Sequence, residues 1–119
     1  MTDSTLYGNI MNQYIAMNRF QVVKSHEKEF EDIWKNRLSF LENISGFQKF
    51  NLLRGPELEK CTIYASHTIW ESEIHFEKWT KSDAFRKAHE GSGKRGHLYL
   101  DHPHFEGFHI VNGTSISSK

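Results

Sequence analysis

The sequence predicts a ferredoxin-like α+β sandwich, with elements in the order βαββαβ and helices on one face of a sheet. Three observations lead to this prediction. Apolar residues recur at helical spacing after a first β-rich segment, a Gly-Pro turn separates two further β-rich runs, and serines precede a second helical region. The 119 residues are enough for one compact domain with a core.

The first half of the predicted domain is a strand followed by an amphipathic helix. Residues 14–23 are β-rich, and Ser25 follows as a plausible N-cap with Glu27 and Glu29 in the first helical turn. Apolar positions then recur at steps of three and four residues up to a turn at 43–46. This helical stripe comprises Phe30, Ile33, Trp34, Arg37, Leu38 and Leu41.

The second half is predicted to be a hairpin, two helices and a last strand. Residues 47–53 alternate in polarity, and Arg54-Gly55-Pro56 supplies a turn before the β-rich run 62–70. Ser72 can cap one helix and Ser82 a third, shorter one. Residues 105–111 then close the sheet as its last strand.

Composition and charge limit the classes of function. The 15 basic and 15 acidic residues are interspersed, so the chain has no electrostatic footprint for nucleic acid. No apolar run approaches the roughly 18 residues that a membrane span needs, and the N-terminus has no secretory pattern. The single cysteine excludes an intrachain disulfide. We therefore expect a cytoplasmic protein with its domain at 13–112, a flexible N-terminal extension at 1–12 and a flexible tail at 113–119.

The first strand indicates a second interface, because residues 15–17 are consecutive and apolar. Successive side chains of a strand point to opposite faces, so neither face of this strand suits water. By this alternation Asn18 shares a face with Ala16 and Phe20, and we assign that face to the helices. The other face, with apolar residues from 62–70, requires a second sheet. A homodimer is therefore expected.

Asn18, Trp79 and His89 are the candidate functional residues. A neutral imidazole is a good axial ligand for haem iron, and large aromatic rings can wall a porphyrin pocket. In one unbroken helix, a ten-residue step would leave Trp79 and His89 roughly 80° apart. A break at 80–83 changes this, because Ser82 can start a new helix in which Phe85 and His89 share a face. The helix pair can then present Phe76, Trp79, Phe85 and His89 over the sheet, opposite Asn18.

On these residues the chain resembles the haem-degrading monooxygenases of the IsdG type, within the antibiotic-biosynthesis monooxygenase (ABM) superfamily. The most specific parts are Asn18-Arg19, Gly46-Phe47 and the segment from Trp70 to His89. The resemblance implies a dimeric α+β barrel with one haem per subunit between sheet and helices. It also implies that His89 is the axial iron ligand, that Asn18 hydrogen-bonds the distal iron-bound ligand and that Trp79 ruffles the porphyrin. The haem-binding set expected is Asn18, Phe20, Phe76, Trp79, Phe85 and His89.

The activity implied is oxidative haem degradation, in which haem is both substrate and oxygen-activating cofactor and iron is released. The sequence has no Gly-x-Gly-x-x-Gly fingerprint, so an external electron donor and a separate reductase are expected. Two alternatives stay open. One is a cofactor-independent monooxygenase that acts on a quinol or aromatic substrate with His89 as a base. The other is a non-catalytic haem carrier.

Several remaining residues have simpler interpretations. Lys94 and Arg95 are candidates for contacts with haem propionates. The spacing of His97, His102, His104 and His109 matches no closed zinc motif, so no structural metal is predicted there. Cys61 is expected to be a small buried residue, and Trp34 and Trp70 are expected in the core.

Overall fold

The structure is a computed structural model that describes residues 12–118 of the chain. The predicted order βαββαβ is confirmed, with short 3-10 helices (η) added to it. The elements are β1 (Tyr14–Val23), α2 (Glu27–Arg37), η1 (Leu38–Phe40), β2 (Phe47–Glu57), β3 (Cys61–Trp70), α3 (Glu73–Thr80), α4 (Asp83–Ala88), η2 (Ser92–Lys94), η3 (Gly96–Leu98) and β4 (His104–His109). The predicted flexible extension 1–12 lies outside the described residues, apart from Asn12.

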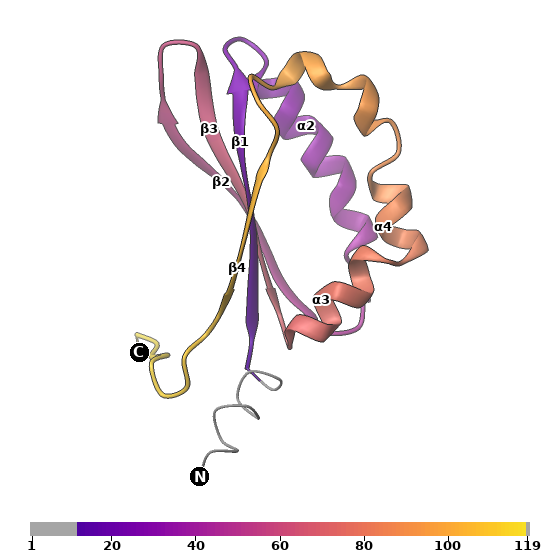
Figure 1. Cartoon of the computed structure of the whole chain (residues 1–119), viewed down its shortest axis with the longest axis vertical. Helices are drawn as coiled ribbons and strands as arrows, with labels where there is room; N and C mark the ends of the chain where they lie inside the picture. The colour runs from indigo at the N-terminus through magenta and orange to yellow at the C-terminus, as the bar shows by residue number, and fades with distance from the viewer. Residues whose placement is uncertain (1–11, 119) are drawn as a thin grey trace.

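The strands form one antiparallel sheet in the order β2-β3-β1-β4. In Figure 1 the helices α2, α3 and α4 all lie on the same side of this sheet, and residues 12–118 place no helix on the other side. The ferredoxin-like α+β prediction is confirmed. None of the helices within residues 12–118 is long and apolar enough to cross a bilayer.

The register assigns the two faces of the sheet. Asn18 of β1 is paired with Ser66 of β3 and with Phe105 of β4, and directly paired residues share a face. Ala16, Phe20 and Val22 alternate with exposed or partly buried neighbours and are themselves buried under the helices. The Asn18 face is therefore the helix-covered face, as the alternation predicted.

Two local expectations are wrong. Ser25 does not cap α2, because its backbone is in the left-handed region with a φ of 77° and His26 occupies the N-cap position. Gly55-Pro56 does not form the hairpin turn either. Strand β2 continues to Glu57, and these residues lie in a register shift between Arg54 and Glu57. Proline is tolerated there because β2 is an edge strand, where a missing backbone donor leaves no partner unsatisfied.

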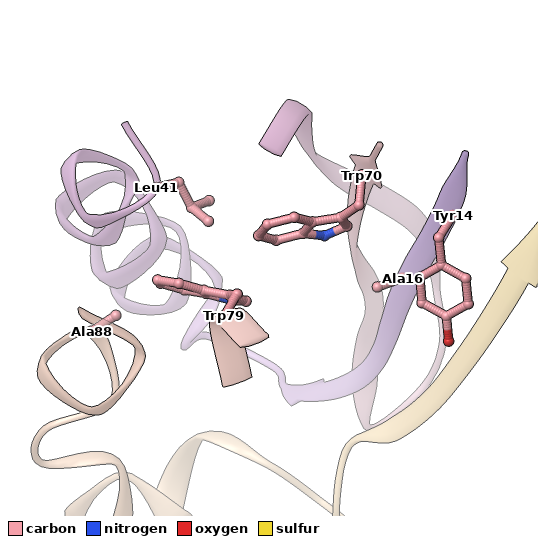
Figure 2. Packing of buried hydrophobic residues seen from close by; sticks show 6 residues of the cluster. All are labelled: Tyr14, Ala16, Leu41, Trp70, Trp79 and Ala88. Atoms are coloured by element: carbon pink, nitrogen blue, oxygen red, sulfur yellow. The ribbon is translucent and has the colours of Figure 1, made fainter. Parts of the chain in front are cut away.

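The core beneath the helices consists of two aromatic clusters with a gap between them. One contains Trp70, which is fully buried, and Trp79, whose ring is inclined by 29° to it at 6.2 Å between centroids. Figure 2 shows these two rings between the strands and the side chains of Leu41, directly after η1, and of Ala88 in α4. The other cluster comprises Phe20, Val22, Phe30 and Tyr64.

The two central strands carry small or polar side chains on the part of the sheet between the clusters. Ala16 and Asn18 of β1 lie beside Thr68 and Ser66 of β3, in the same register positions. Large rings stand at both ends of this row, so the helices are held away from its middle. A hollow over the sheet results from this alternation of large and small residues.

Candidate functional site

The helical wall of the hollow is set by a break between α3 and α4. Helix α3 ends at Thr80 and α4 begins at Asp83, as predicted. Ser82 joins the two ends, because its Oγ accepts a hydrogen bond from the Phe85 N–H at 3.1 Å and donates one to the Trp79 carbonyl at 2.7 Å. The serine therefore caps one helix while satisfying a terminal carbonyl of the other. Ser72 caps α3 in the same way, by accepting the His75 N–H at 3.3 Å.

Two adjoining pockets occupy the space between this wall and the sheet. Their volumes are about 260 Å³ and about 480 Å³, and they form one cleft because they share several lining residues. The combined size suits a cofactor-sized ligand, for which sites of about 300–1,000 Å³ are usual. The shared residues are Asn18, Trp34, Arg37 and His89.

Every residue that the sequence assigned to the haem-binding set lines this cleft. Asn18 and His89 border both pockets, one from the sheet and one from the end of α4. Phe20 borders the larger pocket. Phe76, Trp79 and Phe85 border the smaller pocket.

His89 presents a defined nitrogen to the cleft. Its Nδ1 lies 2.8 Å from the Phe85 carbonyl oxygen, which can only accept a hydrogen bond. Nδ1 therefore carries the proton, and in the neutral ring Nε2 keeps a free lone pair. Burial lowers the pKa of His89 below its ordinary value and the charge of Arg37 lowers it further, although the Phe85 hydrogen bond opposes both. The imidazole is thus neutral at pH 7, and its Nε2 can donate a lone pair to a ligand in the cleft.

Aromatic rings form the apolar wall. The Phe85 ring stacks on the His89 imidazole at 4.1 Å and meets the Trp79 ring edge-on at 5.4 Å. Phe105, from β4, lies parallel to Phe76 at 5.5 Å and also lines the smaller pocket. These contacts fix the ring planes around the cleft, so a flat apolar ligand would meet preorganised surfaces.

Sequence reasoning missed a polar part of the site on α2. Trp34 was expected in the core but is only partly buried, and it lines both pockets together with Arg37. The guanidinium carbon of Arg37 lies 5.1 Å from the centre of the Trp34 ring. Burial lowers the pKa of Arg37, and the nearby charge of Arg95 lowers it further.

Trp34 and Arg37 each carry a buried donor, the indole Nε1 and the guanidinium Nε, with no hydrogen-bond partner among residues 12–118. Buried donors are rarely left without an acceptor, so this end of the cleft is suited to a ligand that supplies one. In the sequence, both residues belong to the amphipathic stripe of α2. Only their position in the structure, beside the small residues of the sheet, shows that they line the cleft.

The remaining predicted residues divide between the site and the scaffold. Arg95 and His102 line the larger pocket, whereas Lys94 is exposed and borders neither of the two pockets. Trp70 and Cys61 are buried, as expected.

Comparisons with known proteins agree with this architecture. Residues 13–91 match the antibiotic biosynthesis monooxygenase family. A staphylobilin-producing haem oxygenase of Staphylococcus saprophyticus is 34% identical over 82 residues, which cover 68% of this chain and 77% of that protein.

Solved structures give the same fold. The haem degrader MhuD of Mycobacterium tuberculosis, with two haems bound in its active site, superposes with a TM-score of 0.64 at 25% identity, covering 86% of this chain and 99% of that one. SnoaB, a cofactor-independent oxygenase of Streptomyces nogalater, superposes with a TM-score of 0.63 at 20% identity, covering 90% and 99%. The second likeness concerns the fold alone. By its match over residues 13–91 and its likeness to a haem oxygenase, the chain belongs to the antibiotic biosynthesis monooxygenase family, and the family expected from the sequence is confirmed.

Proposed function

We propose that this protein is a haem-degrading monooxygenase that binds haem in the cleft between sheet and helices, with His89 Nε2 as the axial iron ligand. The observation that carries the proposal is the hydrogen bond from Nδ1 to the Phe85 carbonyl. This hydrogen bond fixes the orientation of the ring and its tautomer, so that Nε2 is the nitrogen that can bind iron, as metal-bound histidines require. The haem oxygenase and the haem degrader among its relatives support haem as the ligand and haem degradation as the activity.

The chemistry of the cleft fits haem at both ends. The macrocycle is flat and apolar, and stacked rings of α3, α4 and β4 line the smaller pocket. Its carboxylates need cationic or N–H donors, and Arg37, Arg95 and the Trp34 indole line the larger pocket. The partnerless donors of Trp34 and Arg37 would be satisfied by a carboxylate.

The other side chains have distinct roles in the proposal. Bound haem supplies the site of dioxygen activation. The Asn18 carboxamide, on the sheet side, would donate a hydrogen bond to oxygen held on that side of the haem and would stabilise negative charge there. Trp79, held by Trp70 and Phe85, would press against the macrocycle and favour a distorted ring. Electrons would come from an external donor through a separate reductase, and the products would be free iron, an opened tetrapyrrole and a one-carbon fragment.

We also propose that two chains associate through the sheet face that carries no helix. Ile15 of β1 lies between Ile69 of β3 and Phe108 of β4 on this face, and Phe108 is 47% exposed. Leu53 of β2, 42% exposed, lies beside Ala65 on the same face. A second sheet of the same kind would cover it and bury these side chains.

A hemin titration followed by ascorbate in air tests the proposed activity. We expect a Soret band that saturates at one haem per chain and decays with reductant as iron is released. His89→Ala should weaken or abolish the band, whereas His104→Ala, an exposed histidine at the start of β4, should leave it unchanged. No saturable band, or equal bands in both variants, would contradict ligation by His89.

A second candidate is cofactor-independent oxygenation of an aromatic substrate, favoured by the neutral His89 imidazole among stacked rings. Here Nε2 would accept a proton from the substrate instead of binding iron. The titration separates these activities, because this candidate gives no axial-ligand spectrum. A haem carrier would give the spectrum without the decay.

A further inference from the structure

A second group of side chains of the types that bind metal ions lies at the start of α2, and none of the three lines the cleft. His26 occupies the N-cap position of α2, Glu29 lies in its first turn and His97 lies in η3. One ligand atom from each lies within 4.8 Å of the other two. Figure 1 shows the segment that follows α4 returning to the beginning of α2, which explains how residues so far apart in the chain meet.

The distances among these side chains are close to those around a shared metal ion. His97 Nε2 is 3.0 Å from Glu29 Oε2, and His26 Nδ1 is 3.5 Å from Glu29 Oε1. Two ligands bound to zinc at about 2.0–2.2 Å in tetrahedral geometry lie about 3.4 Å apart. Rotation of the side chains would bring one ligand atom of each, now within 4.8 Å of one another, to this spacing. The two imidazole rings are 5.5 Å apart between centroids and at 77° to each other, so their planes do not obstruct the space between them.

The donor set indicates the class of ion. Two imidazoles with one carboxylate suit divalent transition metals such as zinc, whereas calcium and magnesium prefer all-oxygen sites. An exposed carboxylate such as that of Glu29 is ionised at neutral pH. Two imidazolium ions beside one carboxylate would repel each other, but two neutral imidazoles and a carboxylate can share a cation without that cost.

We propose that His26, Glu29 and His97 form a binding site for a divalent transition-metal ion, with water completing the coordination. The site ties η3 to α2 by a link between segments 68 residues apart in the chain. Residues on both sides of His97, namely Arg95, Gly96 and Tyr99, line the larger pocket. Metal binding therefore holds one wall of the cleft against α2, and this inference does not depend on what the cleft binds.

Isothermal titration of Zn²⁺ into tag-free, haem-free protein tests the site. We expect one ion per chain, with affinity at least tenfold lower in His97→Ala and in Glu29→Gln. His104→Ala is the matched control, because exposed His104 lies 3.5 Å from Asp101 and belongs to no group of three such ligands within residues 12–118, and it should keep full affinity. His89→Ala should also keep full affinity, which separates this site from the cleft.

Visible absorption spectroscopy identifies the side chains that bind the ion. Co²⁺ in place of Zn²⁺ should give visible bands that His97→Ala removes and His89→Ala retains. Circular dichroism of each variant checks that the fold is intact, as expected for partly or fully exposed side chains. Absence of saturable binding, unchanged affinity in His97→Ala and Glu29→Gln, or loss in His89→Ala alone would each overturn the proposal.

Discussion

At the scale of single residues, the site depends on which groups the fold leaves with an unused donor or acceptor. His89 donates a hydrogen bond from Nδ1 to the Phe85 carbonyl, and its Nε2 stays available to a ligand in the cleft. Trp34 and Arg37 keep donors for which residues 12–118 offer no acceptor. A fold tolerates buried unsatisfied groups at a cost of about 1–3 kcal/mol each, so they tend to mark positions where a ligand completes the structure.

The ionisation of His89 gives the first prediction at this scale. Burial lowers its pKa, with a further contribution from the Arg37 charge, so the NMR titration midpoint in haem-free protein should lie below 6.5. The unfolded imidazole binds a proton near pH 6.5 and the folded one does not. The contribution of neutral His89 to the free energy of unfolding is therefore fully present above pH 6.5 and is lost as the pH falls through the lowered pKa.

Arg37→Gln should raise the His89 midpoint, because it removes a neighbouring positive charge. Arg19→Gln is the control, since Arg19 pairs with Glu106 on the opposite face of the sheet. Haem affinity should persist as the pH is lowered through 6.5 and fall only when His89 becomes protonated. A midpoint above 6.5 would contradict this prediction and show that the Phe85 hydrogen bond outweighs burial and the Arg37 charge.

Arg37 gives a second prediction, which concerns the carboxylates of haem. Loss of a charge-assisted hydrogen bond costs about 1.5–3 kcal/mol, so Arg37→Gln should weaken hemin binding about 10- to 150-fold. Binding of the hemin dimethyl ester, which lacks the anionic groups, should change little. Absorption titrations with both porphyrins measure the difference. Equal losses for the two would mean that Arg37 only shapes the pocket.

At the scale of elements, the break between α3 and α4 decides which side chains reach the cleft. Two helices with separate axes can both direct rings over the same part of the sheet, and one straight helix cannot. The break depends on Ser82, which serves the last turn of one helix and the first turn of the next. Trp79 and Phe85 flank this serine and meet edge-on as a result.

Ser82→Ala should therefore destabilise the fold by about 0.5–2 kcal/mol, the usual cost of a lost N-cap. Urea unfolding measures this loss, with Ser39→Ala in the exposed part of η1 as the control. Hemin affinity should fall in Ser82→Ala as well, because the relative positions of Trp79 and His89 are less fixed. If the variant loses stability but hemin affinity does not change, the Ser82 cap does not determine the geometry of the site.

At the scale of the whole molecule, the sequence predicts the fold and the residues of one wall better than it predicts the cleft itself. Alternation and capping signals are local, so the order of elements along the chain, the Asn18 face and the Ser82 break could all be predicted from the sequence. The hollow could not, because it depends on Ala16, Ser66 and Thr68 meeting across strands. For the same reason, the sequence did not predict the role of Arg37 or the His26–His97 contact, because both depend on segments that are distant in the chain.

The sheet face that carries no helix supports the last prediction, which concerns association of the chain. Ile69 lies on this face next to Ile15, and a second copy would bury it. Light scattering after size exclusion should give twice the chain mass for the unmodified protein. Ile69→Glu should give the mass of one chain, because an unpaired buried carboxylate costs about 3–5 kcal/mol. Asn112→Glu adds the same charge at an exposed position after β4 and should remain a dimer. If the unmodified protein is monomeric at high concentration, or if Ile69→Glu dimerises like Asn112→Glu, this face is not the interface.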